Sequence, residues 1–283
     1  FGFIIFEIIY IHMLGKSMKY HYNDIRKAYK KIGISKGMTI SLKTDLRFLG
    51  PYDDEQKSNV LAAHFNVLAD LIDLSEGNIV VSSATFSLCN TGKVFDIDNT
   101  PSEMGALTEY IRNMPGACRS FHPFTSYVAI GKDADYICSN TSRHSVGPNS
   151  PKARLLKFDT QYLSIGFHPS LVTMIIHHIE EMMGVPYRYV KEFIHPVLRE
   201  GEVFNEPFYL FVRYLECNAK MNLNTKIYPN FFKNGYKVKE EKLGRGNIYS
   251  YSMNEFYVSA VESLTEDLYA CLESKPLIRP YRK

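Results

Sequence analysis

The sequence predicts an α/β fold in which helices and strands form layers. The chain has 283 residues, enough for one large α/β domain. Apolar runs typical of buried strands alternate with amphipathic segments up to about residue 190, and this alternation is typical of layered α/β proteins. The later segments are mostly strand-like, so we expect a C-terminal β-rich extension on this fold.

The first elements follow from apolar spacing. A helix is predicted from Asn23, because apolar residues recur there at helical intervals, and a second helix is predicted over 55–73. The runs "GMTISLKT" (37–44) and "NIVVSSATF" (78–86) are typical of buried strands. The stretch "DLRFLGPY" between them is predicted to be the loop that leaves the first strand.

A helix start is predicted at Thr100, with Pro101 at the first helical position and Glu103 closing a capping box. The elements expected after it are strand 126–131, a short helix from Ser150, strand 161–167 and a helix containing two adjacent histidines.

The C-terminal part begins with a predicted strand over 207–214, followed by a hairpin whose arms flank "LGRGN" (243–247). A last helix is predicted to open with a capping box of Ser252 and Glu255. The residues expected on its buried side are Tyr257, Val261, Leu264, Leu268 and Leu272.

The opening "FGFIIFEIIYIHML" is apolar but short. It contains Glu7 and His12, whereas a spanning helix needs roughly 20 apolar residues. A basic start and a small-residue cleavage site, which a signal peptide requires, are both missing from it. We therefore expect residues 1–17 to be an upstream or non-native extension and residues 18–283 to form a single domain.

Composition excludes several classes of protein. The net charge is only +3 and no long Lys/Arg run occurs, so nucleic acid is not an expected partner, and no membrane association is expected either. The five cysteines are widely spaced without a C-x-x-C pair, which argues against a disulfide framework or a thiolate zinc site. A reducing, cytoplasmic location is predicted.

The stretch "IIHHIEEMMGVPYRY" (175–189) concentrates titratable groups in an apolar run. On a helix, His177 shares a face with Glu180, and His178 with Glu181, because residues three or four apart are neighbours. A carboxylate beside an imidazole fixes its tautomer and stabilises the imidazolium, which a general base needs. The same pattern also fits a buried histidine with a satisfied hydrogen bond in a protein core.

A metal site is the third interpretation of this stretch. Zinc-binding helices place two histidines about one turn apart, whereas His177 and His178 are adjacent and point about 100° apart. Further His or Cys ligands are not clustered elsewhere in the sequence, so no metal is expected.

Three other polar segments fit either a binding site or an ordinary turn. Arg119, Ser120 and His122 precede the predicted strand at 126, where loop residues often line a cleft. Thr44 and Asp45 stand at a strand end, where α/β sheets tend to bind ligands. The remaining candidates are His168, between a strand and the histidine helix, and Cys118 and Cys138, for which buried thiols are the simpler interpretation.

Taken together, these segments resemble the aminoglycoside 3-N-acetyltransferase family, antibiotic acetyltransferases whose fold is unrelated to the GNAT superfamily. The resemblance runs in order over about residues 20–272. "RSFHPFTSYVAIG" is similar to the family's Arg-Ser-x-His-Pro-x-x-Ser signature, and "HHIEEMMGVPYRY" to its His-x-x-Glu helix with a Val-Pro-Tyr-Arg tail. The other similar segments are "ISLKTDLRFLG", "FDIDNTPSEMGALTEYIR", "GPNSPKARLL" and "LSIGF".

The resemblance implies a three-layer α/β/α arrangement around a mixed sheet, acetyl-CoA as donor and a small-molecule amine as acceptor, with a homodimer as a compatible assembly. It places the catalytic pair at His177 and Glu180. The positions that it places against coenzyme A are Thr44, Asp45, Leu46, Arg119 and Ser120, with His122 nearby on the cleft wall. Two further substrate-side candidates come from the residues themselves: Asp96 as a carboxylate of an acidic cleft, and His168 from its place before the histidine helix.

Two departures from the family pattern concern the acyl and acceptor sides. The family has Thr three residues before the catalytic His, but here Met174 stands there and Thr173 one step earlier. The family's Pro-Thr-Phe after the second strand is replaced by Ala84-Thr85-Phe86.

The acceptor stays open between two classes of amino sugar. An aminoglycoside is a polycation, and Asp96, Asp98 and Glu103 are the carboxylates that would line an acidic cleft. A nucleotide-linked or polysaccharide-precursor amino sugar would instead profit from positive charge. A non-catalytic or metal-dependent protein on the same scaffold is the third possibility, because fold does not fix function.

Overall fold

The computed structural model describes residues 19–53, 59–171 and 175–281. A seven-stranded mixed sheet with the order β3-β4-β2-β1-β5-β9-β8 forms its centre. The central strands β1 (Thr39–Thr44), β2 (Asn78–Ala84) and β5 (Gln161–Ile165) are parallel, and the pairs outside them are antiparallel. The outer strands are β3 (Cys118–Arg119), β4 (Thr125–Gly131), β8 (Lys239–Leu243) and β9 (Gly246–Ser252). The predicted boundary near Met18 lies outside the described residues.

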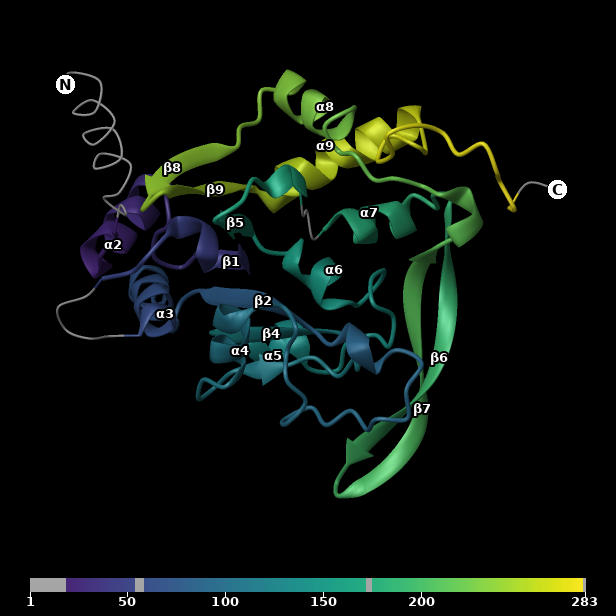
Figure 1. Cartoon of the computed structure of the whole chain (residues 1–283), viewed down its shortest axis with the longest axis horizontal. Coiled ribbons are helices and arrows are strands. Elements are labelled where there is room, and N and C mark those ends of the chain that lie inside the picture. The colour runs from purple at the N-terminus through teal and green to yellow at the C-terminus, as the bar shows by residue number, and fades with distance from the viewer. Residues whose placement is uncertain (1–18, 54–58, 172–174, 282–283) are drawn as a thin grey trace, which may run out of the picture.

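Helices cover both faces of this sheet (Figure 1). Alternation along each strand sends neighbouring side chains to opposite faces, so Ile79 and Val81 join one apolar cluster and Val80 joins the other. The first cluster includes α2 (Tyr22–Lys31), α3 (Val60–Ile72) and α4 (Ala106–Arg112). The second includes α5 (Ala134–Cys138), α6 (Pro151–Leu155), α7 (Ile176–Met182), α8 (Ile227–Lys233) and α9 (Met253–Glu266). The predicted three-layer α/β/α architecture is confirmed.

A long two-stranded hairpin extends from this body. Strands β6 (Arg188–Arg199) and β7 (Glu202–Arg213) pair over their whole length (Figure 1). The hairpin packs on a third apolar cluster, which contains Phe95 and Phe124, through Val197 near its turn and through Phe208 and Leu210 along β7. The C-terminal β-rich region therefore divides into two parts, because β8 and β9 extend the central sheet and the hairpin stands apart from it.

The predicted helix start at Thr100 is wrong. The helix begins only after Gly105, because the preceding residues bind the loop beyond β2. The Thr100 hydroxyl accepts from the backbone of Asp96, and the amide of Glu103 donates to the carbonyl of Ala84. Gly105 has a φ of 105°, a conformation that favours glycine, and it turns the chain into α4.

The last helix begins as predicted and ends earlier than predicted. The Ser252 hydroxyl accepts from the amide of Glu255, and the helix stops at Glu266. Leu268 is 38% exposed and Leu272 lies beyond the helix. Its buried side consists mainly of Met253, Phe256, Ser259, Ala260, Ser263 and Leu264.

Candidate active site

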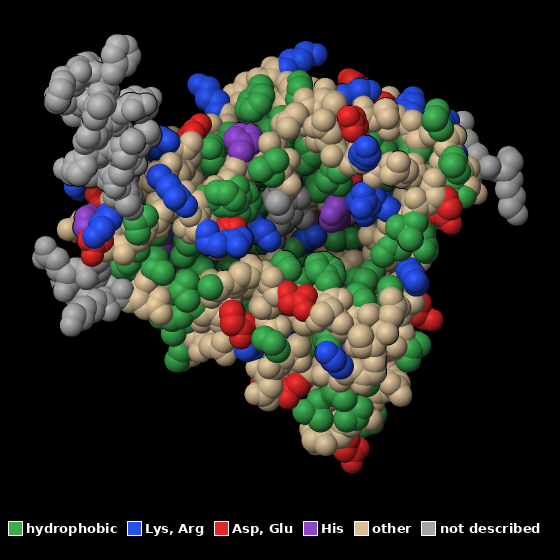
Figure 2. All heavy atoms as spheres, viewed as in Figure 1, with side chains coloured by type: hydrophobic (Ala, Val, Ile, Leu, Met, Phe, Trp, Pro, Cys, Tyr) green, Lys and Arg blue, Asp and Glu red, His purple; other side chains and the backbone are tan. Residues whose placement is uncertain are grey.

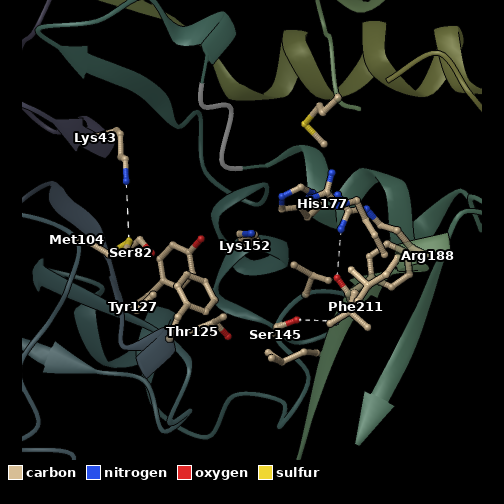
Figure 3. Close-up of a pocket in the computed structure, with 18 residues that line it drawn as sticks. Lys43, Ser82, Met104, Thr125, Tyr127, Ser145, Lys152, His177, Arg188 and Phe211 are labelled. Carbon is tan, nitrogen blue, oxygen red and sulfur yellow. Dashed lines mark hydrogen bonds between the residues drawn. The ribbon is translucent and has the colours of Figure 1, made fainter. Parts of the chain in front are cut away.

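A cavity of about 730 Å³ opens between the carboxyl ends of β1 and β2 and the start of the β6–β7 hairpin. Ligands of α/β sheets commonly bind where parallel strands end. Figure 2 shows this face hollowed across its middle, with basic side chains gathered along the hollow. Figure 3 shows His177 and Arg188 on one side of the cavity and Lys43 on the other. The cavity is therefore shared by the sheet, α6, α7 and the hairpin.

His177 reaches the cavity from the first turn of α7. Its Nδ1 atom lies 2.7 Å from the carboxylate of Glu180, one helical turn away, and its side chain is 42% exposed. Because an ionised carboxylate can only accept, Nδ1 carries the proton and donates it. The Nε2 atom is then an unprotonated acceptor, which is the tautomer that a general base requires.

Glu180 is fully buried and has three partners. The Tyr187 hydroxyl donates to its other oxygen at 2.7 Å, and the Arg188 guanidinium lies 2.9 Å away as an ion pair. A buried carboxylate is costly unless it is paired and hydrogen-bonded. Tyr187 and Arg188 come from the "VPYRY" segment after α7, so the sequence places two partners of Glu180 directly after the helix that carries it.

The pKa values of the pair move in the direction that suits a base. Burial lowers the pKa of His177, and the hydrogen bond and charge of Glu180 oppose that effect without cancelling it. Burial alone would raise the pKa of Glu180, but its hydrogen bond with His177 and the charge of Arg188 outweigh burial and lower it. The imidazole is thus neutral and the carboxylate ionised near pH 7.

The rival pair of His178 and Glu181 faces elsewhere. His178 is buried, and its Nδ1 atom accepts from the amide of Gly147 at 3.2 Å. Burial lowers its pKa to about 4. Glu181 lies 3.9 Å from His144. Neither His178 nor Glu181 lines the cavity, so His177 is the better candidate for a general base.

The residues predicted to contact coenzyme A divide into two groups. Thr44 ends β1, beside the cavity residue Lys43. The Asp45 carboxylate caps the next turn and binds Arg47, which lowers its pKa, and Leu46 packs on an apolar cluster. These three positions stand next to the cavity without lining it.

Arg119 and Ser120 are buried further inside. Arg119 donates to the hydroxyl of Ser126 and to three backbone carbonyls, with the shortest contact at 2.5 Å. The Ser120 hydroxyl accepts from the amide of Tyr127. Both side chains therefore hold the loop beside the sheet, and their contact with coenzyme A stays a prediction.

The residues predicted on the substrate side are dispersed. His122 is buried, its Nδ1 atom binds Thr125, and burial lowers its pKa to about 3. Asp96 accepts from Asn99 in a turn. His168 binds the hydroxyl of Ser170. None of the three lines the cavity, so their contact with a substrate also stays a prediction.

Sequence reasoning missed the basic residues of the cavity. Lys43, Lys152, Arg188 and Arg213 all line it, together with the aromatic ring of Tyr127. Lys152 stands in "GPNSPKARLL" and Arg188 in "VPYRY", segments that the family resemblance contains without assigning these residues a role. Their convergence depends on tertiary structure, which sequence spacing does not express.

Three further predictions concern the residues before the catalytic pair, a metal site and a membrane-spanning helix. Thr173 and Met174 lie outside the described residues. Within the described ranges, no group of three or more His, Cys, Asp or Glu side chains is placed to hold a metal ion. No helix in the described part of the chain is long and apolar enough to cross a membrane.

Comparison with known proteins supports the resemblance. The family model for aminoglycoside 3-N-acetyltransferase matches residues 65–265. The chain is 33% identical over 99 residues to aminoglycoside N(3)-acetyltransferase VII of Streptomyces paromomycinus, a match that covers 35% of this chain and 34% of the relative. A longer match of 255 residues, at 24% identity, covers 82% of this chain and 88% of the aminoglycoside N(3')-acetyltransferase-like protein YokD of Bacillus subtilis. The first curated relatives are matched over about a third of their length.

Solved structures show the same fold. Aminoglycoside acetyltransferase AAC(3)-Xa superposes with a TM-score of 0.76 at 20% identity, over 88% of this chain and 94% of that one. AAC-IIIb in a binary complex with CoASH superposes with a TM-score of 0.72 at 16% identity, over 88% of this chain and 97% of that one.

Proposed function

Because the chain belongs to the aminoglycoside 3-N-acetyltransferase family, we propose that it transfers the acetyl group of acetyl-CoA to a primary amine of an amino sugar. The observation that carries this proposal is the pairing of His177 with the buried Glu180 at 2.7 Å, on the wall of a cavity. The names of its relatives, aminoglycoside N(3)-acetyltransferases, support an amino sugar as the class of acceptor.

The pair suits a direct transfer. His177 Nε2 takes the proton that the amine loses as its nitrogen bonds to the acetyl carbon. The same atom returns the proton to sulfur as the carbon–sulfur bond breaks, which releases the free thiol and the amide. Glu180 orients the ring and offsets the charge that develops on it. A base positioned in this way typically contributes about 10²–10⁴-fold.

The cavity wall offers a path for the acyl donor. Phe86, Met104, Leu210 and Phe211 give it apolar surface, and the hydroxyls of Ser82 and Thr125 add hydrogen-bonding groups. A largely apolar wall with a few polar groups is typical of small-molecule sites. Thr44, Asp45 and Leu46 adjoin this wall, which supports their predicted contact with coenzyme A.

Assembly and location belong to the same proposal. A homodimer and a cytoplasmic location stay predictions. The five cysteines are all free thiols, which is compatible with a reducing compartment.

A thiol-release assay tests the proposal. The full chain is incubated with acetyl-CoA and a panel of amines that contains sisomicin, glucosamine and phosphorylated glucosamines, and free coenzyme A is measured. We expect thiol release that depends on one class of amino sugar and persists with a metal chelator. Absence of release with every amine, together with absence of coenzyme A binding in calorimetry, would favour the non-catalytic alternative. Loss of release with the chelator would favour a metal-dependent enzyme.

A further inference from the structure

The charge of the cavity wall is strongly one-sided. Four basic side chains line the cavity, namely Lys43, Lys152, Arg188 and Arg213. Among the described lining residues there is no Asp or Glu. Clefts lined by one sign of charge concentrate ligands of the opposite sign. This wall therefore favours an anionic ligand.

Two of these cations have no described carboxylate in ion-pair contact, and Glu180 and Glu181 act on Lys152 only from beyond that distance. Within the described residues, neither Lys43 nor Lys152 forms an ion pair, and the Lys43 ammonium contacts only the sulfur of Met104, at 3.9 Å. Burial lowers the pKa of Lys43, and burial with the charge of Arg188 lowers that of Lys152 to about 8. Both shifts express a desolvated ammonium group, which an anion would stabilise.

The nearest carboxylates do not reverse this charge. Glu180 is fully buried and already holds His177, Tyr187 and Arg188. It pairs with Arg188, and with Glu181 it acts on Lys152 without an ion pair, so Lys43, Lys152 and Arg213 have no carboxylate beside them on the described cavity wall. Arg213 donates to the carbonyl of Ala219 at 2.6 Å and is exposed. The cavity keeps three cations that no carboxylate on its described wall balances.

We propose that the amine acceptor is a negatively charged amino sugar, in its simplest form a phosphorylated one, whose anion binds Lys152. This inference rests on the proposed acetyl transfer. Lys152 and His177 line the same cavity (Figure 3), and the charge of Glu180 reaches Lys152, so an acceptor whose amine meets His177 can place its anion at Lys152. A polycationic aminoglycoside would instead bring ammonium groups against these cations.

Coenzyme A is the other anion that could explain the charges. Its phosphates are separated from the thioester by the whole pantetheine arm, whereas Lys152 stands close enough to the catalytic pair for the charge of Glu180 to influence its pKa. A cation at that position suits an anion on the acceptor better than one at the far end of the donor.

Acceptor kinetics test the inference first. kcat/KM is measured at saturating acetyl-CoA for glucosamine, glucosamine 6-phosphate, uridine-diphosphate-linked glucosamine and sisomicin. We expect the phosphorylated acceptors to exceed glucosamine by roughly tenfold or more, the scale of one charge-assisted contact. The monophosphate and nucleotide forms distinguish a simple phosphate ester from a nucleoside diphosphate. A higher kcat/KM for sisomicin than for both phosphorylated forms overturns the inference and leaves the proposed transfer intact.

Charge variants test whether the anion of the acceptor binds Lys152. The readout is the ratio of kcat/KM for the preferred phosphorylated acceptor to kcat/KM for glucosamine. Lys152→Gln should lower this ratio by roughly tenfold, whereas Lys152→Arg, which keeps the charge, should retain most of it. Lys27→Gln is the matched control, because Lys27 is exposed on α2 away from the cavity and the change in net charge is the same.

Coenzyme A affinity, measured by calorimetry on the same variants, separates donor from acceptor. An unchanged ratio together with weaker coenzyme A binding in Lys152→Gln would show that the cation serves the donor, and would overturn the inference. Absence of thiol release with every amine would overturn the proposed function itself, and the inference with it.

Discussion

The carboxylate of Glu180 decides how basic His177 is. Burial pushes the pKa of the imidazole down, and the hydrogen bond and negative charge of Glu180 push it back up. The buried Arg188 and Tyr187 hold the carboxylate in place, so the ring has one tautomer and one orientation. The pKa of His177 therefore depends on one neighbouring carboxylate.

We predict that Glu180→Gln lowers kcat and shifts the pH profile. Removing the charge removes a factor that raises the pKa of His177, so the acidic limb of kcat/KM should move to lower pH, while kcat falls by roughly 10- to 100-fold as the ring loses its support. Rates measured from pH 5 to 9 check this. Tyr187→Phe is the comparison, because it removes one hydrogen bond to Glu180 and keeps the charge. An acidic limb that stays in place in Glu180→Gln would contradict the assigned role.

A second histidine, His64, makes the stability of the fold depend on pH where α2 packs on α3. His64 is fully buried, and its two ring nitrogens contact the hydroxyls of Tyr20 at 3.2 Å and Tyr29 at 2.6 Å. Burial lowers its pKa to about 3. The folded state therefore holds this ring neutral at a pH where the unfolded chain would protonate it.

We predict that the contribution of His64 to stability falls with acidification. The unfolded chain binds the extra proton below the ordinary pKa of 6.5, so the contribution is complete above that value and falls progressively as the pH drops toward 3. Urea unfolding from pH 7 to 4 should give a shallower pH dependence for His64→Gln than for the parent chain. Parallel curves for the two proteins would refute this prediction.

The residues that follow β1 and β5 approach each other closely beside the cavity. Gly166 follows β5 with a φ of 94°, and a Cβ there would lie 2.2 Å from the carbonyl oxygen of Asp45. The loop that carries Thr44 and Asp45 can approach β5 only because this residue has no side chain. Gly201, in the turn of the β6–β7 hairpin, has a φ of 85° with open space around it.

We predict that Gly166→Ala destabilises the fold by more than about 2 kcal/mol, because backbone strain and a steric clash add there. Gly201→Ala carries the strain alone and should cost about 1 kcal/mol. Free energies of unfolding from urea titration check both values. Equal losses in the two variants would show that the contact with Asp45 has no role.

Regular elements were largely predictable and their ends were less so. Apolar spacing located β1, β2, β4 and β5, since buried strands need continuous apolar runs. The helix predicted at Thr100 does not form there, because the Thr100 hydroxyl binds the amide of Asp96 in the preceding turn and the amide of Glu103 binds the distant carbonyl of Ala84. Capping residues recognise local backbone, and tertiary hydrogen bonds can take them over. The β6 strand was not predicted, because its pairing with β7 produces a projecting hairpin with few buried residues.

The site as a whole could be predicted only where its chemistry is local. His177 and Glu180 are one helical turn apart, so spacing alone could pair them. Lys43 on β1, Lys152 on α6 and Arg213 on β7 meet because the sheet, the second helical layer and the hairpin enclose one cavity. The charge of that cavity, and with it the inferred acceptor, follows from the assembled molecule and from no single segment.

The proposed acetyl transfer requires His177 to act as the base that takes the proton of the amine. The direct test measures thiol release by His177→Ala with acetyl-CoA and the preferred amine, together with coenzyme A affinity by calorimetry. We predict that kcat falls by about 10²–10⁴-fold while coenzyme A affinity changes less than about threefold, because the ring meets the reacting amine and not the body of the donor. Near-normal kcat in His177→Ala would contradict the proposed role of His177 as the base.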